Sequence, residues 1–268
     1  MNGKQYVHSY SEREAERLVD QATTLAGILH SGTEYPPRSM VLEVGCGVGA
    51  QTQILARKSP QAKFMSIDIS AESLKIGRER ITSEGLANVT FLRGDIFDMP
   101  FREESFDHVF ACFVLEHLPS PVEALLHMRK VLKRGGSITS IEGDHGSTFF
   151  HPDSPCARST IQCLIDIQRR LGGNALLGRQ LHPLLTEAGY RDVQVSPRTV
   201  YVDSSRLDLV RGFTRNTFIA MVEGVREEAI RTGLIRGKEW EQGIRDLYRT
   251  TDPGGTFVYS FFSSQGLK

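Results

Sequence analysis

The amino-acid sequence predicts an α/β fold built on a doubly wound parallel sheet. Short, almost wholly apolar segments alternate with amphipathic helical patterns over the first half of the chain. This alternation is typical of parallel strands joined by helical crossovers, and strands covered on both faces carry few polar residues. A glycine-rich turn, Gly45-Cys46-Gly47-Val48-Gly49, joins the first of these strands to the next helix. The 268 residues suffice for one large domain or for a core domain with an insertion.

The composition is that of an ordinary globular protein, with 40% hydrophobic and 24% charged residues. Lysine and arginine together number 32, as do aspartate and glutamate, so no net field attracts nucleic acid or an anionic membrane. The four cysteines lack CxxC spacing and suggest neither a metal site nor a disulfide framework. The first ten residues lack the apolar core of a signal peptide, and no apolar run approaches membrane-spanning length. We therefore expect a cytoplasmic protein with no nucleic-acid partner and no membrane span.

Helices and strands follow in a regular order along the first half of the chain. Apolar residues at helical spacing predict a first helix over residues 11–28. Five strands and three helices alternate after it, and Gly135-Gly136 marks the end of the last helix. The expected strands are residues 41–44, 63–68, 89–92, 108–113 and 137–142, and the expected helices are residues 51–58, 71–84 and 121–132.

The regular alternation of predicted strands and helices ends after Gly143. Two helices are expected first, over residues 156–171 and 177–188, and a long strand follows over residues 193–202. A helical block from residue 207 to about 249 precedes a closing strand over residues 256–262. The simplest arrangement of these two strands is an antiparallel pair at one end of the sheet. The block between them is too long for a turn, so we expect it to be an insert.

This order predicts four parts. Residues 1–38 form an N-terminal helical arm or lid, and residues 39–205 form the cofactor-binding core with the helices after the fifth strand. Residues 206–250 form a helical lid or substrate insert, and residues 251–268 supply the final strand of the core sheet.

The glycine-rich turn is the main functional signal. Glycine permits a tight turn and a close approach of the backbone to a ligand, and the helix that follows presents free N–H groups. Gly45, Gly47 and Ala50 also match the dinucleotide fingerprint, and Asp68 at the end of the second strand can accept hydrogen bonds from ribose hydroxyls. These residues predict an adenosine-containing cofactor, and they leave S-adenosylmethionine (SAM) and NAD(P) both open.

Three later motifs favour SAM. Gly94-Asp95-Ile96 ends the third strand, where a carboxylate can accept from an adenine amine. Residues 106–118 contain the fourth strand and the short loop that it runs into, and residues 132–136 close the next helix. Together with the turn, these motifs resemble the class I SAM-dependent methyltransferases from about residue 40 to residue 142. The match is closest to the small-molecule branch that includes the ubiquinone and menaquinone C-methyltransferases. The resemblance implies a seven-stranded, Rossmann-like sheet whose last strand is antiparallel.

The resemblance also implies a set of cofactor-binding residues. The turn would lie against the methionine part of SAM with Glu43 beneath it, and Asp68 would bind the ribose. Asp95 would accept from the adenine amine, between apolar neighbours on the two faces of the ring. The loop after the fourth strand would lie near the methionine end. The full set is Glu43, Gly45, Cys46, Gly47, Gly49, Asp68, Ile69, Asp95, Ile96, Phe113 and His117.

The resemblance implies transfer of a methyl group from SAM to oxygen, nitrogen or carbon of a small-molecule acceptor, with S-adenosylhomocysteine (SAH) as product. Such a transfer needs mainly in-line placement and a dry site. The Asn/Asp-Pro-Pro-Tyr/Phe tetrad of enzymes that methylate nucleobases and glutamine is missing after the fourth strand, where residues 114–117 read Val-Leu-Glu-His. Two alternatives stay open: a SAM-binding protein without turnover, and an NAD(P)-dependent oxidoreductase.

Candidate groups for the acceptor side follow the fifth strand in Glu142-Gly143-Asp144-His145, at the edge where open α/β sheets bind ligands. We expect His145 to act as a base, since an imidazole titrates near neutrality. In the alternative, Glu142 and Asp144 cap a neighbouring helix or pair with Arg179. No metal is expected, because no helix or loop spacing supports a metal site here.

The N-terminal segment carries the last candidate. The resemblance favours Tyr10 as a lid over SAM, and the alternative is an arm packed on the sheet or on a neighbouring subunit. This arm and the helical insert also offer surfaces for a homo-oligomer.

Overall fold

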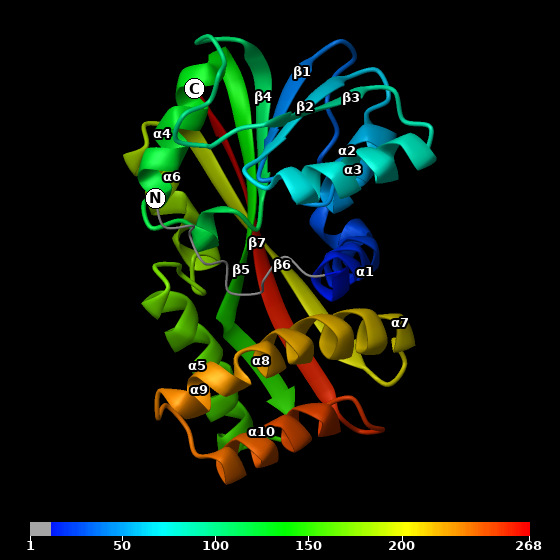
Figure 1. Cartoon of the computed structure of the whole chain (residues 1–268), viewed down its shortest axis with the longest axis vertical. Helices are drawn as coiled ribbons and strands as arrows, with labels where there is room; N and C mark the ends of the chain where they lie inside the picture. Colours follow the sequence, from blue (N-terminus) through cyan, green and yellow to red (C-terminus); the bar gives the residue numbers. More distant parts are fainter. Residues whose placement is uncertain (1–11) are drawn as a thin grey trace. The chain divides into compact units, whose positions relative to one another are not determined.

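The computed structural model describes residues 12–268, with side chains from residue 17 onward (Figure 1). Its single sheet has seven strands in the order β3-β2-β1-β4-β5-β7-β6, with β7 antiparallel. The predicted fold class is therefore confirmed, including the antiparallel last strand. The strands are β1 (Met40–Val44), β2 (Lys63–Asp68), β3 (Val89–Arg93), β4 (Phe106–Cys112), β5 (Leu132–His151), β6 (Arg191–Asp203) and β7 (Thr256–Leu267).

Helices connect the strands in the predicted alternation. A helical insert, α7 to α10, separates β6 from β7, as the sequence predicts. The helices are α1 (Glu12–Leu29), α2 (Ala50–Lys58), α3 (Ala71–Ser83), η1 (Leu115–His117), α4 (Pro121–Val131), α5 (Pro155–Arg170), η2 (Gly178–Gln180), α6 (Leu181–Glu187), α7 (Leu207–Leu209), η3 (Val210–Ile219), α8 (Ala220–Gly224), α9 (Arg226–Arg231) and α10 (Gly237–Arg249).

The chain divides into two compact units. The first comprises residues 1–25, 143–176 and 199–261, and the second comprises residues 26–142, 177–198 and 262–268. The four-part division expected from the sequence stays a prediction.

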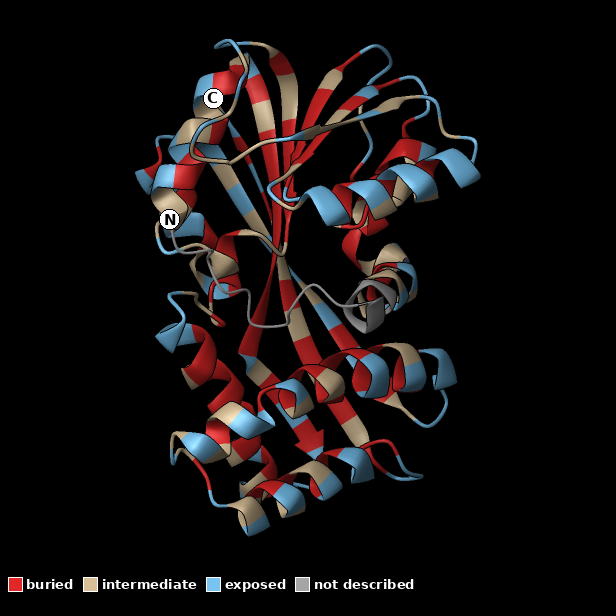
Figure 2. Ribbon diagram, viewed as in Figure 1, coloured by how far each residue is buried: buried red, intermediate tan, exposed pale blue. Residues whose placement is uncertain are grey.

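The second unit carries the parallel part of the sheet. β1 pairs in parallel with β2 and β4, β2 pairs with β3, and β4 pairs with β5. Residues of β1 and β4 are almost entirely buried (Figure 2), because helices cover the sheet and leave little need for polar side chains. Leu125 and Met128 of α4 and Leu181 and Leu185 of α6 complete this core. Parallel strands end at one edge, so the turn after β1 and the loops after β2 and β4 meet there.

The first unit has an aromatic core. Phe213 and Phe218 of η3 contact Phe257, Tyr259 and Phe261 of β7, with ring centroids 4.8 to 6.2 Å apart. All five side chains are at most 2% exposed. Aromatic pairs at such distances add packing energy beyond the area that they bury, so this cluster holds the insert against β7.

The observed elements differ from the expected ones in several places. The fifth strand, expected to end at residue 142, runs on to His151. Glu142, Asp144 and His145 therefore lie within β5 and do not follow it, as the sequence had suggested.

The helix expected to run to residue 132 ends at Val131, and Leu132 already begins β5, which includes Gly135 with φ of 75°. The register between β4 and β5 shifts near this point, which accommodates the two glycines inside the strand. The helical block expected from residue 207 contains a π-helix, η3, in which the Thr217 hydroxyl donates to the Gly212 carbonyl five residues earlier.

Candidate cofactor site

The glycine-rich turn closes tightly at the carboxyl end of β1. Gly45, Gly47 and Gly49 have φ of 66°, 51° and 76°, in the left-handed region that favours glycine. A Cβ on Gly45 would lie 2.5 Å from Val114 Cγ2, and one on Gly49 would lie 3.1 Å from Gly77 Cα. A Cβ on Gly47 would meet no atom within 4 Å among the described residues. Packing therefore requires two of the glycines, and the third leaves the turn open to a ligand.

Asp68 lies beside this turn at the end of β2. Its Oδ2 accepts from the Gly47 N–H and its Oδ1 from the Ser70 N–H, both at 2.8 Å. Burial raises the pKa of Asp68, and these N–H groups oppose that rise. Each carboxylate oxygen has a second lone pair, so Asp68 can hold the turn and still accept from a ligand hydroxyl.

Glu43 is 2% exposed and lies under the same edge. Its Oε2 accepts from Thr52 Oγ1 of α2 and Ser66 Oγ of β2, both at 2.7 Å. Glu43 thus ties α2 to β1 and β2. Burial raises its pKa from 4.5 to about 7, with Asp68 adding to the rise and the two hydroxyls opposing it.

The raised pKa of Glu43 predicts a pH-dependent stability. Because the folded-state pKa is the higher one, the stabilising contribution is present below about pH 4.5 and is lost as the pH rises through about 7. The loss has an upper limit of about 3 kcal/mol, at 1.36 kcal/mol per pKa unit. Glu43→Gln removes the titration and keeps an acceptor oxygen. Urea unfolding at about pH 5 and pH 8 should therefore show a smaller pH dependence in the variant, and equal dependence would contradict the assignment.

The residues expected around adenine follow β2 and β3. Ile69 is 53% exposed directly after Asp68, and such a large apolar side chain at the site edge is available to a ligand. Asp95 Oδ1 accepts from the Phe97 N–H at 3.0 Å, and the Asp98 N–H donates to the Asp95 carbonyl at 3.0 Å. The tight turn so formed fixes the Asp95 carboxylate. Ile96 is half-buried in the same turn.

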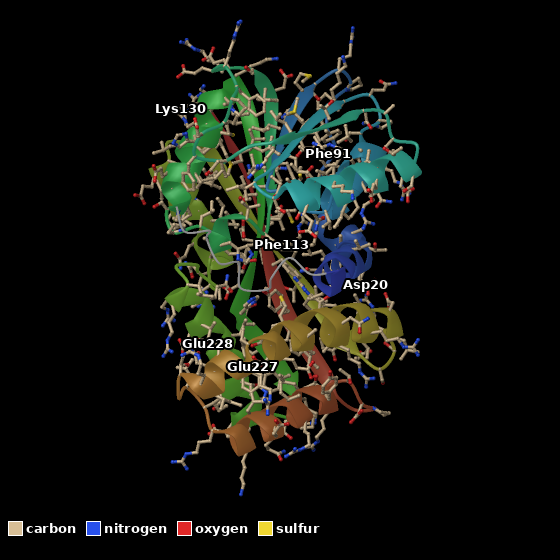
Figure 3. The ribbon with its side chains drawn as sticks, viewed as in Figure 1. Asp20, Phe91, Phe113, Lys130, Glu227 and Glu228 are labelled. Atoms are coloured by element: carbon tan, nitrogen blue, oxygen red, sulfur yellow. The ribbon has the colours of Figure 1, made fainter. Side chains whose placement is uncertain are left out.

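The last two of the expected cofactor-binding residues, Phe113 and His117, lie in the loop after β4. Phe113 (Figure 3) has φ of 58°, which is uncommon for an aromatic residue, and its N–H donates to the Ile141 carbonyl at 2.9 Å. His117 ends η1, with Nε2 3.6 Å from Glu116 Oε1. The expected residues after β1, β2, β3 and β4 thus all belong to the second unit, at the carboxyl ends of its strands.

Cys46 lies inside the turn and is 7% exposed. Its N–H donates to the Ile67 carbonyl at 3.0 Å, which ties the turn to β2. Burial raises the pKa of the Cys46 thiol well above its usual range, so the thiol stays neutral. The four cysteines are free within the described chain.

His145 belongs to the first unit. Its Nδ1 lies 2.7 Å from the hydroxyl of Tyr259, and its ring contacts Phe218 edge-on. Burial lowers the pKa of His145 to about 4, with Asp144 opposing and Arg17 reinforcing that shift. The expectation that this imidazole titrates near neutrality is therefore wrong. The role of His145 as a base stays a prediction, and the group that would accept the proton is a neutral imidazole.

Glu142 caps a neighbouring helix, as the alternative expected, because its partners belong to the N-terminal end of η1, whose N-cap is Val114. Its carboxyl accepts from the backbone N–H groups of the loop after β4, at 2.9 to 3.4 Å. Among the described residues, no group of three or more His, Cys, Asp or Glu side chains is arranged to hold a metal ion. Tyr10 lies outside the described residues.

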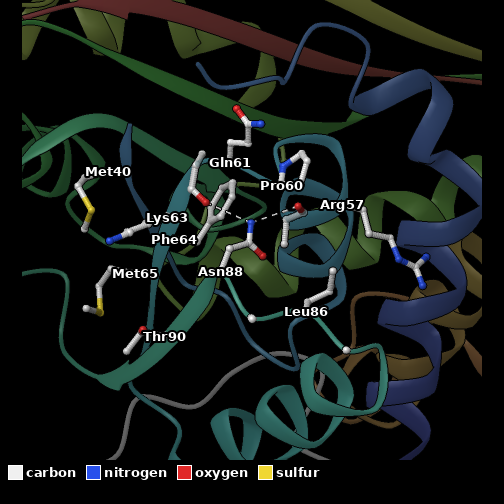
Figure 4. Close-up of a pocket in the computed structure, with 14 residues that line it drawn as sticks. Met40, Arg57, Pro60, Gln61, Lys63, Phe64, Met65, Leu86, Asn88 and Thr90 are labelled. Carbon is white, nitrogen blue, oxygen red and sulfur yellow. Dashed lines mark hydrogen bonds between the residues drawn. The ribbon is translucent and has the colours of Figure 1, made fainter. Parts of the chain in front are cut away.

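A pocket of about 740 Å³ lies at the opposite ends of the same strands (Figure 4). It is lined by Met40 and Lys63, the first residues of β1 and β2, and by Asn88 just before β3. The Asn88 amide donates to the carbonyls of Ala56, Ser59 and Ala62. The glycine-rich turn follows the other end of β1, so this pocket is not the predicted cofactor site.

Sequence reasoning missed several partners of the site residues. Thr52 and Ser66 hold Glu43, Tyr259 holds His145, and Val114 packs on the glycine-rich turn. For Thr52 and Ser66 the available signal was a small polar residue among apolar ones, since a buried hydroxyl needs a partner, and no local pattern pointed to Tyr259 or Val114.

Comparisons with known proteins agree with this geometry. A family model described as a methyltransferase domain matches residues 37–189, more than half of the chain. An uncharacterized 37.1 kDa protein of transposon TN4556 from Streptomyces fradiae is 32% identical over 209 residues, which cover 77% of this chain and 59% of that protein. Demethylmenaquinone methyltransferase from Listeria monocytogenes is 35% identical over 103 residues, which cover 38% of this chain and 44% of that enzyme. The chain thus spans about half the length of these curated relatives.

The crystal structure of YcgJ from Bacillus subtilis is similar with a TM-score of 0.59 and 15% identity, covering 92% of this chain and 98% of that one. At this identity the likeness concerns the fold alone. The chain belongs to the methyltransferase domain family, of the class I SAM-dependent type. The predicted enzyme class and the cofactor SAM, with SAH as product, are confirmed as properties of that family. No described helix is both long and apolar enough to span a membrane.

Proposed function

We propose that this protein transfers a methyl group from SAM to a small-molecule acceptor by in-line displacement and releases SAH. The observation that carries the proposal is the position of Asp68, which holds the open glycine-rich turn by the Gly47 N–H and retains free lone pairs. When bound, SAM supplies an electrophilic methyl group on a sulfonium leaving group. The protein then has mainly to bind, align and exclude water.

The proposed roles of the cofactor-binding residues follow from the geometry. Asp68 accepts from the ribose hydroxyls, and Asp95, held by the Phe97 N–H, accepts from the adenine amine. Ile69 and Ile96 cover the adenine faces. The Gly47 side of the turn and the loop that carries Phe113 and His117 surround the methionine part. Glu43, held by Thr52 and Ser66, lies beneath the turn and helps to orient the turn and the ammonium group of SAM.

Two observations support a small-molecule acceptor. Equal numbers of acidic and basic residues provide no net attraction for a polyanion. The relative from Listeria monocytogenes that matches this chain over 103 residues is named for a small-molecule substrate, demethylmenaquinone. On the acceptor side, we propose His145 as the base where the acceptor must lose a proton. Its imidazole is neutral and Tyr259 fixes the ring, while the pKa of about 4 makes it a weak base.

The test is SAH formation from SAM in the presence of single small-molecule acceptors, followed by mass spectrometry. We expect SAH and a product heavier by one methyl group with at least one acceptor. In His145→Gln, turnover should fall while the Kd for SAH stays that of the wild type. SAM binding without SAH formation across a broad panel would support the non-catalytic alternative, and NADH binding without SAM binding would support the oxidoreductase.

A further inference from the structure

Another carboxyl group, that of Glu142, lies at the cofactor edge of the second unit. Glu142 is fully buried on β5. Its Oε1 accepts from the N–H groups of Val114 at 3.2 Å and Leu115 at 2.9 Å, and its Oε2 accepts from that of Glu116 at 3.4 Å. Three successive backbone N–H groups thus converge on one side chain, an arrangement that binds anions in many proteins. Here the anion-binding position is filled by the protein itself.

The loop held in this way is in direct contact with the glycine-rich turn. Val114 Cγ2 approaches Gly45 so closely that a Cβ there would lie 2.5 Å away. The left-handed Phe113 precedes Val114, and η1, which ends at His117, follows it. Fixing the backbone of this loop therefore fixes one wall of the glycine-rich turn. It also fixes Phe113, just before Val114, and His117, at the end of η1.

We infer that Glu142 is a positioning residue for SAM binding, which acts by ordering the backbone of residues 114–116. The inference rests on the proposed function. A flexible loop loses conformational entropy when a ligand orders it, and this loss weakens binding. A loop that the protein has already ordered does not lose that entropy when the ligand binds. Glu142 is not a catalytic residue in this account, because it acts through the loop.

The neighbourhood of Glu142 decides which substitution is conservative. Burial and the nearby carboxyl of Glu116 raise the pKa of Glu142 well above its usual range, while the N–H groups of the loop oppose the rise. Glutamine keeps an acceptor oxygen for the N–H groups of Val114 and Leu115 and loses the one for Glu116. Leucine keeps the approximate size and loses both oxygens.

The test compares Glu142→Leu, Glu142→Gln and a matched control, Ser140→Ala. Ser140 is also fully buried on β5, two residues earlier, and its hydroxyl has no hydrogen-bond partner within the described part of the chain. Calorimetric titration with SAH should give a Kd at least about tenfold higher for Glu142→Leu. Glu142→Gln should recover most of that loss, and the control should match the wild type. A folded Glu142→Leu protein that binds SAH as tightly as the wild type would overturn the inference.

Hydrogen exchange provides a second measurement that needs no ligand and no leucine variant. In Glu142→Gln the Glu116 amide should exchange faster than in the wild type. The Phe113 amide, which donates to the Ile141 carbonyl, should be unchanged and serves as the internal reference. Unchanged exchange at Glu116 would show that Glu142 does not order the loop. Failure of the wild type to bind SAH would instead refute the proposed function, and the exchange result would still decide the role of Glu142.

Discussion

Asp68→Ala should raise the Kd for SAH by roughly 100-fold. The carboxylate is placed to accept from two ribose hydroxyls, and hydrogen bonds to a charged group contribute about 1.5–3 kcal/mol each. Losing two of them costs at least about 3 kcal/mol, and this lower limit corresponds to a factor of roughly 100. The variant also loses the bonds from the Gly47 and Ser70 N–H groups, which loosens the turn. Calorimetric titration with SAH measures the effect.

Two further variants make this result specific. Asp68→Asn keeps the size of the side chain and lacks one acceptor oxygen, so its affinity should lie between those of wild type and Asp68→Ala. Asp208→Ala removes an exposed carboxylate on α7 and should bind SAH like the wild type. Wild-type affinity in a folded Asp68→Ala protein would show that Asp68 does not bind the cofactor.

Alanine at Gly45 and at Gly47 should have different effects, although both residues have positive φ. Gly45→Ala adds a left-handed alanine, which costs about 1–2 kcal/mol, and an overlap with Val114, which costs about 1–3 kcal/mol more. Its unfolding free energy in urea should fall by about 2–5 kcal/mol. Gly47→Ala incurs only the backbone cost, and its methyl group occupies the open side of the turn. Its Kd for SAH should rise about tenfold.

Gly85→Ala is the matched control for the backbone cost. Gly85 also has φ of 66°, and a Cβ there meets no atom within 4 Å in the described chain. The difference in unfolding free energy between Gly45→Ala and Gly85→Ala therefore measures the contact with Val114. If the two variants are equally stable, that contact is not rigid. If Gly47→Ala binds SAH like the wild type, the ligand does not approach the turn at Gly47.

The part of the fold that the sequence predicted depends on local patterns. The strand before the turn and the strand that ends at Asp68 are short apolar segments followed by glycine or an acidic residue, and both lie where expected. The end of α4 was placed one residue late, at residue 132, and the strand after it was expected to begin only at residue 137. Glycine usually ends a helix, and Gly135-Gly136 instead lies within β5, where the register shift absorbs it.

The contacts that the sequence did not predict join residues far apart in the chain. Glu142 holds a loop 26 to 28 residues earlier, and His145 bonds to Tyr259, 114 residues later. Periodicity and spacing carry no information about such pairs, because each partner alone has the pattern of an ordinary strand or loop residue. The pKa of His145 was missed for the same reason: its surroundings, and so its burial, are set by aromatic residues of η3 and β7.

One calorimetric experiment decides which cofactor the glycine-rich turn binds. The wild-type protein is titrated in turn with SAM, SAH and NADH. We expect saturable binding of SAM and SAH to one site per chain and no heat of binding for NADH. Saturable binding of NADH, with no response to SAM or SAH, would contradict this expectation.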